Sequence, residues 1–413
     1  MSNNPETDLG GHAARVPAAP PLESPELQTP ELRAWLRLSM TPGVGDHTAR
    51  KLLAHFGLPE QLFTAPEHEL RSLVTPLQVS ALLQEPPGLQ AQLTRTQAWL
   101  NAAEDPVQRR VVTLGDALYP DGLLQMADPP LLLYLMGRLD LPLKHAVAVV
   151  GSRNPTPQGA LNARQFSLAL AEAGVTVVSG LALGVDGAAH EGALQGLASP
   201  ADLMATVATV AVVGTGLDRV YPRAHHALAH RIAQQGWVVS EYPIGTPPLA
   251  ANFPKRNRLI AGLSQATLVV EAALKSGSLI TARLALEQGK EVMAIPGSIH
   301  ATQARGCHAL IRQGAKLVES AQDVLEDLQL APRLSRGLND PEAENDTTDA
   351  DDPSTHAENP LLQAMGWAPL SLDDLQATSG LAIGPLQAQL MALELDGEVV
   401  RMPGGLLQRI ARS

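Results

Sequence analysis

The chain has 413 residues, of which 45% are hydrophobic, and a formal net charge of −12 at pH 7. This length and apolar content allow two or three folded units with at least one large core. A single cysteine, Cys307, excludes an intramolecular disulfide and favours a reducing compartment. No run is apolar and long enough to cross a membrane, and the start lacks the features of a secretion signal. We therefore expect a cytoplasmic protein.

The N-terminal third is expected to hold a tail and a helical domain. Residues 1–30 are rich in Pro, Glu and Ala without helical periodicity, which is typical of a disordered tail. Residues 31–105 show the apolar spacing of helices, broken at 41–48 by a proline and two glycines. This break is similar to a SAM-like helix-hairpin-helix, in which Asp46 or Thr48 caps the next helix and hairpin amides approach a phosphate. A helical hairpin used only for packing fits equally well.

Residues 106–330 alternate short β-branched runs with amphipathic stretches, the signature of βαβ units and a parallel sheet. Small or polar residues follow these runs, and in a doubly wound sheet such positions lie at the carboxyl edge, where ligands bind. We predict a Rossmann-like, doubly wound, mostly parallel sheet with an anion-binding edge. The stretch 198–204 interrupts this alternation of strands and helices, and its sequence indicates no function. The runs predicted as strands are 111–112, 147–150, 175–178, 207–213, 238–239, 268–270, 292–295 and 316–318.

An acidic segment follows the central domain. Between Asp340 and Glu358 there are eight Asp or Glu and no Lys or Arg, so residues 331–359 are predicted to form a disordered linker. Because this linker holds much of the negative charge, the overall acidity does not exclude a local basic site in the central domain.

Residues 360–413 predict three helices followed by two strands, which is the pattern of a small winged helix. The third helix enters the major groove in many such folds. Here its exposed face offers Gln387, Gln389 and Glu394 without Lys or Arg. Sequence-specific duplex binding is therefore disfavoured, and a contact with a protein is at least as well supported.

Seven motifs occur in order along the central domain, and their combination is specific. The motifs are Val149-Val-Gly-Ser-Arg153, Ser179-Gly-Leu-Ala-Leu-Gly-Val-Asp186 with Ala189-His190, Gly216-Leu-Asp218 with Tyr221-Pro222, Ser240-Glu-Tyr-Pro243, Phe253-Pro-Lys-Arg-Asn-Arg-Leu-Ile-Ala-Gly262, Ser276-Gly-Ser-Leu-Ile-Thr281 and Ile295-Pro-Gly297. Together they resemble the DNA-processing protein A (DprA/Smf) family over almost the whole domain, and many members have helical and winged-helix units in the same places.

The resemblance implies a non-enzymatic protein that binds single-stranded DNA. It implies that the protein protects incoming DNA and loads the RecA recombinase during natural transformation and recombination. Single-strand-binding protein is a further implied partner, and a homodimer is the implied assembly. No cofactor, metal or membrane is implied. No residue pattern in this sequence identifies the surface that contacts RecA.

The predicted DNA contacts combine small residues with cations. Amides and hydroxyls of the small residues suit phosphate oxygens, and Arg or Lys supplies charge-assisted hydrogen bonds. Internal ion pairs of Arg256 or Arg258 with Glu241 or Glu271 remain an alternative. Since only 3% of residues are aromatic, we expect backbone contacts to dominate and binding to weaken strongly with salt. The predicted contacts are Gly151, Ser152, Arg153, Ser179, Gly180, Lys255, Arg256, Asn257, Arg258, Ser276, Gly277 and Ser278.

Two other classes of protein remain in competition with this prediction. No G-x-x-x-x-G-K-[ST] motif occurs, and Arg219 stands where a dinucleotide fingerprint starting at Gly214 needs its third glycine. The segment 276–281 with Glu287 is loosely similar to the glycine-rich loop and acid of the cytokinin-activating phosphoribohydrolases. Asp186 and His190 share a helix face, but helix capping and loop bracing explain them better than acid–base chemistry. A structural adaptor without DNA affinity is the third class.

Overall fold

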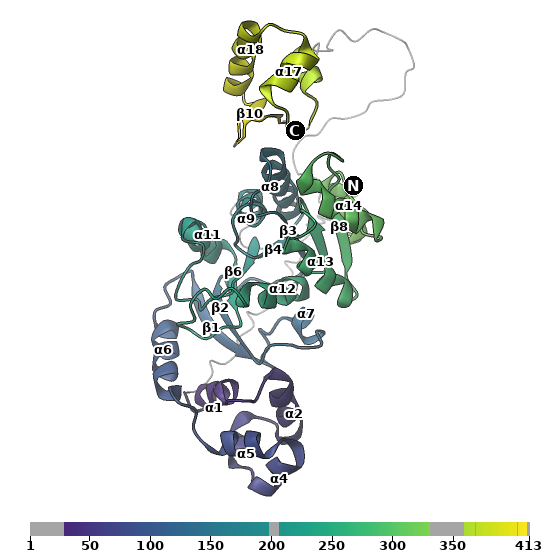
Figure 1. The fold of residues 1–413 in the computed structure, drawn as a ribbon. Helices are drawn as coiled ribbons and strands as arrows, with labels where there is room; N and C mark the ends of the chain where they lie inside the picture. Colours follow the sequence, from purple (N-terminus) through teal and green to yellow (C-terminus); the bar gives the residue numbers. More distant parts are fainter. Residues whose placement is uncertain (1–28, 198–205, 331–358, 368, 403, 411–413) are drawn as a thin grey trace, which may run out of the picture.

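The computed structural model describes residues 29–197, 206–330, 359–367, 369–402 and 404–410. Most of the predicted tail (1–30), the predicted stretch 198–204 and nearly all of the predicted acidic linker (331–359) lie outside these residues. Figure 1 shows helices at one end, a central sheet and a small C-terminal unit at the other end. No helix within the described ranges is long and apolar enough to cross a bilayer.

The N-terminal part is helical, as predicted, and its apolar stripe forms the core. Leu32, Trp35 and Leu36 are each at most 2% exposed, at the spacing that places them on one helix face. The expected cap of the second helix is absent, because its N-cap is Gly45, which has no side chain to accept a hydrogen bond. The helices are α1 (Thr29–Met40), α2 (Asp46–Phe56), α3 (Pro59–Thr64), α4 (Glu67–Leu73), α5 (Pro76–Leu83) and α6 (Leu89–Asn101).

The central part is a nine-stranded sheet in the order β1-β2-β6-β5-β4-β3-β7-β8-β9. β1 and β2 pair antiparallel with each other, and β2 pairs antiparallel with β6, whereas every other neighbouring pair is parallel. The strands are β1 (Gln108–Thr113), β2 (Leu132–Gly137), β3 (Ala146–Val150), β4 (Thr176–Ser179), β5 (Thr209–Val212), β6 (Trp237–Ser240), β7 (Ala266–Val269), β8 (Glu291–Ala294) and β9 (Lys316–Leu317).

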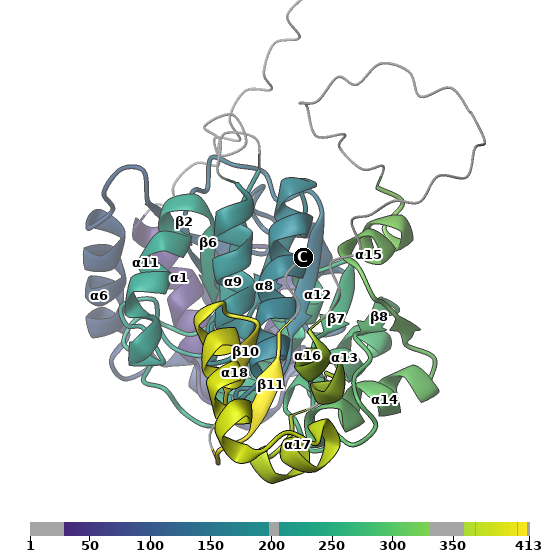
Figure 2. The same ribbon diagram turned by 90° about the horizontal axis from the view of Figure 1, so that it is seen from above.

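Helices cover both faces of this sheet (Figures 1 and 2). The alternation of side chains along β3 divides the core, since Val147 and Val149 join one apolar cluster and Ala148 and Val150 join the other. The first cluster includes residues of α8 (Pro157–Glu172), α9 (Val185–Gly196) and α11 (His226–Gln235). The second includes residues of α7 (Asp121–Leu124), α12 (Asn252–Leu263), α13 (Ser278–Glu287) and α14 (Arg305–Arg312). The doubly wound prediction is thereby confirmed.

The C-terminal unit is the predicted winged helix. Its three helices and strand pair enclose a separate apolar core built on Leu361, Leu375, Leu386 and Leu390. α15 (Ala321–Asp327) is the last helix described before it. The elements of the unit are α16 (Pro360–Met365), α17 (Leu372–Ser379), α18 (Ile383–Leu395), β10 (Val399–Arg401) and β11 (Leu407–Arg409).

Candidate nucleic-acid interface

Seven parallel strands, from β6 to β9 across the sheet, end at one edge. From β3 the chain runs outward through β4, β5 and β6, and it then returns to place β7, β8 and β9 on the other side of β3. β3 and β7 therefore flank the point where the winding direction reverses, which is where doubly wound folds bind ligands. The predicted contacts follow β3, β4, β6 and β7, so they lie along this edge.

The loop after β3 holds Gly151, Ser152 and Arg153. A Cβ on Gly151 would lie 2.7 Å from Val185 Cγ2 and 2.9 Å from the Glu271 carbonyl oxygen, so close packing requires glycine here. The Ser152 amide donates to the Glu271 carbonyl at 2.7 Å, and it is therefore not available to a phosphate as the sequence had suggested. The Ser152 hydroxyl accepts from the Asn154 amide at 3.1 Å, which leaves its proton to donate. Arg153 is exposed.

The loop after β4 is held by internal contacts. The Ser179 hydroxyl, fully buried, donates to the Val149 carbonyl at 2.7 Å. The Gly180 and Ala182 amides donate to one Asp186 carboxylate oxygen at 3.1 and 3.3 Å. The expected phosphate contacts of Ser179 and Gly180 thus face a physical difficulty, because their polar groups already have partners. Asp186 secures this loop and does not cap α9, whose N-cap is Gly184.

Arg256 lies behind the same loop and is 4% exposed. Its Nη2 donates to the Gly180 carbonyl at 2.6 Å, and a Cβ on Gly180 would collide with the guanidinium. Burial lowers the pKa of Arg256 to about 10, and the Asp186 carboxylate opposes that shift. Burial also raises the pKa of Asp186, with Arg256 as the largest opposing influence. The two opposite charges are both buried under the strand-end loop, where each opposes the shift that burial causes in the pKa of the other.

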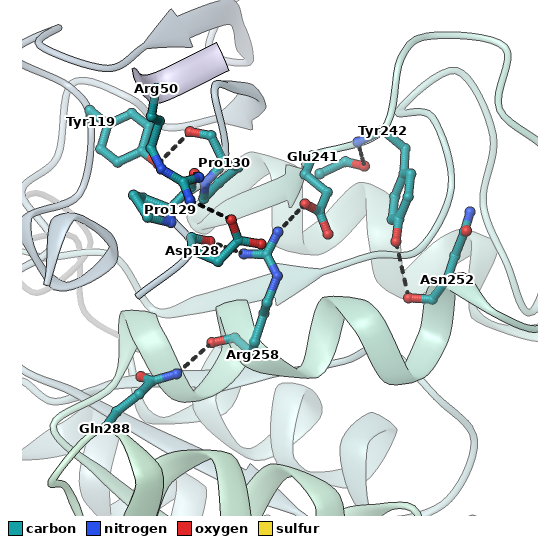
Figure 3. A network of polar contacts seen from close by, with 11 residues as sticks. Arg50, Tyr119, Asp128, Pro129, Pro130, Glu241, Tyr242, Asn252, Arg258 and Gln288 are labelled. Atoms are coloured by element: carbon teal, nitrogen blue, oxygen red, sulfur yellow. Dashed lines mark hydrogen bonds and ion pairs between the residues drawn. The ribbon is translucent and has the colours of Figure 1, made fainter. Parts of the chain in front are cut away.

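Arg258 makes the internal ion pair that the sequence left open as an alternative. Its guanidinium contacts the Glu241 carboxylate, and the two side chains are only 12% and 5% exposed. Nη1 also donates to the Asp128 carbonyl at 3.0 Å. The Asp128 carboxylate pairs with Arg50 of α2 at 2.7 Å, as Figure 3 shows. Arg258 therefore belongs to a network that fastens the helical part to the sheet.

Lys255 and Asn257 lie on α12, which begins at Asn252, one turn earlier than the sequence suggested. Lys255 is exposed, and Asn257 is half-buried on the same helix. No side chain caps the start of α12, whose N-cap residue is Ala251. Lys255 thus adds a positive charge in the first turn, where the helix dipole also favours an anion.

The loop after β7 provides two hydroxyls and a turn. Ser276 Oγ and Ser278 Oγ lie 2.7 Å apart in a hydrogen bond, so one of the two protons remains to donate elsewhere. Gly277 is exposed, and a Cβ at this position would meet nothing within 4 Å. Gly277 is therefore not required by packing, which leaves room beside the serines for an approaching group.

Lys275 and Arg223 are among the exposed cations at this edge that the sequence prediction did not include. Lys275 directly precedes the serine loop, and Arg223 lies in the segment after β5. Within the described part of the chain, neither side chain forms an ion pair, and the same is true of Arg153 and Lys255. The signal for Lys275 was its position beside Ser276. Isolated cations in loops are common, so the sequence alone did not distinguish it.

The groups weighed for acid–base or nucleophilic chemistry are buried or remote. His190 hydrogen-bonds Thr209 Oγ1 at 2.7 Å through Nδ1, at the start of β5 and not at the strand ends, and burial lowers its pKa to about 3. Burial raises the pKa of Cys307 to about 12. Among the described residues, no group of three His, Cys, Asp or Glu side chains could hold a metal.

Glu287 also lies away from the serine loop. It ends α13, about 13 Å along the helix axis from Ser278 at 1.5 Å per residue, and it pairs with Arg283 at 2.9 Å. A cavity of about 630 Å³ exists elsewhere, between α6 and β1, and Arg109 and Gln97 are among its lining residues. None of its lining residues belongs to a loop at the carboxyl edge of the parallel strands.

The fold and this edge define a class of protein. Its members have a Rossmann-like domain with exposed cations and hydroxyls along the strand ends, and this domain follows a helical domain and precedes a winged helix in the sequence. Residues 110–329 match the family model of DNA recombination-mediator protein A, and residues 345–405 match the model of the DprA winged helix domain. The chain belongs to the DNA recombination-mediator protein A (DprA/Smf) family.

Curated relatives and a solved structure agree with this assignment. The chain is 38% identical to Protein Smf of Escherichia coli over 91% of this chain and 95% of that protein. It is 47% identical to DNA processing protein DprA of Streptococcus pneumoniae over 52% of this chain and 72% of that protein. The X-ray structure of the S. pneumoniae protein covers 73% of this chain and 98% of its own, with a TM-score of 0.60 and 35% identity.

Proposed function

We propose that the chain binds single-stranded DNA along the carboxyl edge of its parallel sheet. The observation that carries the proposal is that Arg153, Lys255 and Lys275 are exposed in segments that follow β3, β6 and β7. These cations suit phosphate oxygens, which dominate the affinity of most DNA-binding proteins. Relatives named DNA processing protein support a nucleic-acid ligand.

The proposed contact set differs in emphasis from the residues that the sequence singled out. Arg153, Lys255 and Lys275 supply the charges, while Ser152, Ser276 and Ser278 supply hydroxyls. The remaining predicted residues shape the edge. The loops after β3 and β4 are held by Gly151, Ser179, Gly180 and Arg256, and Arg258 ties that region to the helical domain. Asn257 and Gly277 are assigned neither a contact with DNA nor a role in holding the loops.

The wider role is proposed from family membership and not from geometry. Loading of RecA, contact with single-strand-binding protein, a homodimer and a part in natural transformation in the cytoplasm remain predictions of that membership. The proposal assigns no chemical step and no cofactor to the edge. A phosphoribohydrolase activity is disfavoured because Glu287, the required acid, sits at the far end of α13 from the serine loop.

Alanine substitutions of the exposed cations test the proposal. Arg153→Ala and Lys255→Ala should each weaken binding of a fluorescent single strand by about tenfold at low salt, because each removes one phosphate contact. Each should also lower the slope of log K against log salt by about 0.7. Arg283→Ala is the matched control, since Arg283 is exposed on α13 and paired with Glu287. Equal affinity and equal slope in all four proteins would contradict the proposed edge.

A further inference from the structure

Five large apolar side chains stand exposed along the same edge. Each belongs to the segment that follows a different strand, β4, β5, β6, β7 and β8 in turn. Apolar side chains of this size usually lose solvent exposure on folding, and a row of them marks a surface with a ligand. The side chains are those of Leu183 (46% exposed), Tyr221 (48%), Leu249 (51%), Leu274 (58%) and Ile299 (75%).

The row follows the order of the strands. In the sheet, β6, β5, β4, β3, β7 and β8 are consecutive neighbours. Strands in a sheet lie about 4.8 Å apart, so the segments from β6 to β8 span on the order of 24 Å. Only the loop after β3 lacks a large exposed apolar side chain, and that loop carries Arg153. The length is sufficient for several nucleotides of a strand.

Exposed cations lie close in sequence to two of these apolar groups. Leu274 is followed directly by Lys275, and Tyr221 lies two residues before Arg223. Leu183 precedes Gly184, where an added Cβ would press on the Ser152 and Arg153 carbonyl oxygens. A ligand that fits this edge carries anionic groups as well as flat apolar groups. Single-stranded nucleic acid has this chemistry, because its bases are unpaired and their faces are free.

We propose that Leu183, Tyr221, Leu249, Leu274 and Ile299 form a base-contact row that packs against the nucleobases of single-stranded DNA. This inference rests on the proposed function and adds the origin of its selectivity. Phosphate contacts alone hold a duplex and a single strand in similar ways. The base-contact row favours the single strand, because a duplex keeps its base faces stacked inside. Burial of aliphatic and base surface also persists at high salt, where the electrostatic contribution fades.

The test compares two double variants of the full chain. Leu274→Ser with Ile299→Ser removes two members of the base-contact row without changing charge. Leu286→Ser with Leu124→Ser is the matched control, since these exposed side chains (51% and 47%) lie at the end of α13 and on α7, outside the strand-end segments. Binding is measured for a fluorescent single strand, for a duplex and for an abasic oligonucleotide of equal length, at several salt concentrations.

The row variant should bind the single strand about three- to tenfold more weakly than wild type at every salt concentration, with an unchanged salt slope. Its affinity for the abasic oligonucleotide and the duplex should equal that of wild type, and the control variant should match wild type throughout. Equal single-strand affinity of the row variant and wild type would overturn the base-contact row and leave the proposed function standing. A change confined to oligomeric state would overturn it in favour of a protein interface. Absence of single-strand binding by wild type would instead overturn the proposed function itself.

Discussion

The basic residues of the Lys255–Arg258 segment have different environments although they are neighbours in sequence. Lys255 is exposed, whereas Arg256 is buried against Gly180 and Arg258 is paired with Glu241. The sequence predicted that this cluster begins a helix, and it lies in the first two turns of α12. The sequence did not predict which cation faces solvent, because that depends on the rotation of α12 and on the long-range approach of Asp128, Glu241 and Asp186.

Arg256→Ala should destabilise the central domain strongly. The substitution leaves the Asp186 carboxylate buried without its opposite charge, and such losses cost about 3–5 kcal/mol. It also removes the hydrogen bond to the Gly180 carbonyl. Thermal unfolding of the full chain measures the effect, with Arg153→Ala as an exposed control of unchanged stability. A melting temperature equal to that of wild type would show that the Arg256 guanidinium does not support the loop after β4.

At the scale of elements, the sequence predicted most strands and helices but missed β2. Its residues, Leu132–Gly137, are rich in Leu and contain no β-branched residue, so Tyr134 gave the only signal of β propensity. The strand exists because Leu133, Tyr134 and Leu135 are completely buried between β1 and β6. Long-range burial of this kind overrides local propensity, and neither periodicity nor turn residues reveal it.

Lys290 connects the end of α12 to the start of β8 and should make stability depend on pH. Its ammonium donates to the Ala261 and Gly262 carbonyls at 2.8 and 2.7 Å, and burial lowers its pKa from 10.5 to about 8. Between pH 8 and 10.5 the unfolded chain therefore holds a proton that the folded chain has lost. Stability contributed at this position rises with pH across that window.

Urea unfolding of wild type and Lys290→Met at pH 7, 8.5 and 10 measures this contribution. The free energy of unfolding of wild type should increase relative to that of the variant as the pH rises, since other titrating groups cancel in the difference. A constant difference across the three pH values would show that Lys290 has an ordinary pKa.

The winged helix should be dispensable for binding of short single strands. In α18 the exposed polar positions are amides, and Glu394 pairs with Arg401 of β10. Arg409 stacks on Trp367 at 4.3 Å and donates to the Leu362 carbonyl. A chain that ends at Leu330 should therefore bind a short oligonucleotide within about threefold of the full chain, because phosphate contacts set affinity. Fluorescence anisotropy measures this, and a collapse of binding would place the primary site in the winged helix.

At the scale of the whole molecule, the order of domains and the fold class were predictable because they depend on patterns repeated over many residues. The contact between the helical domain and the sheet was not predictable. It depends on a network of Arg50, Asp128 and Arg258 (Figure 3). Arg50 and Asp128 are 78 residues apart along the chain and Asp128 and Arg258 are 130 residues apart, so the spacing of residues in the sequence does not reveal the network.

A sheet edge with exposed cations and a row of apolar side chains is expected to select single-stranded DNA. The most direct measurement is a titration of one fluorescent oligonucleotide, single-stranded and as a duplex, with the full chain at several salt concentrations. Tighter binding of the single strand is expected, with affinity that falls steeply with salt and a preference for the single strand that persists at high salt, because the base contacts do not depend on salt. Equal affinity for the two forms, or affinity independent of salt, would contradict this expectation.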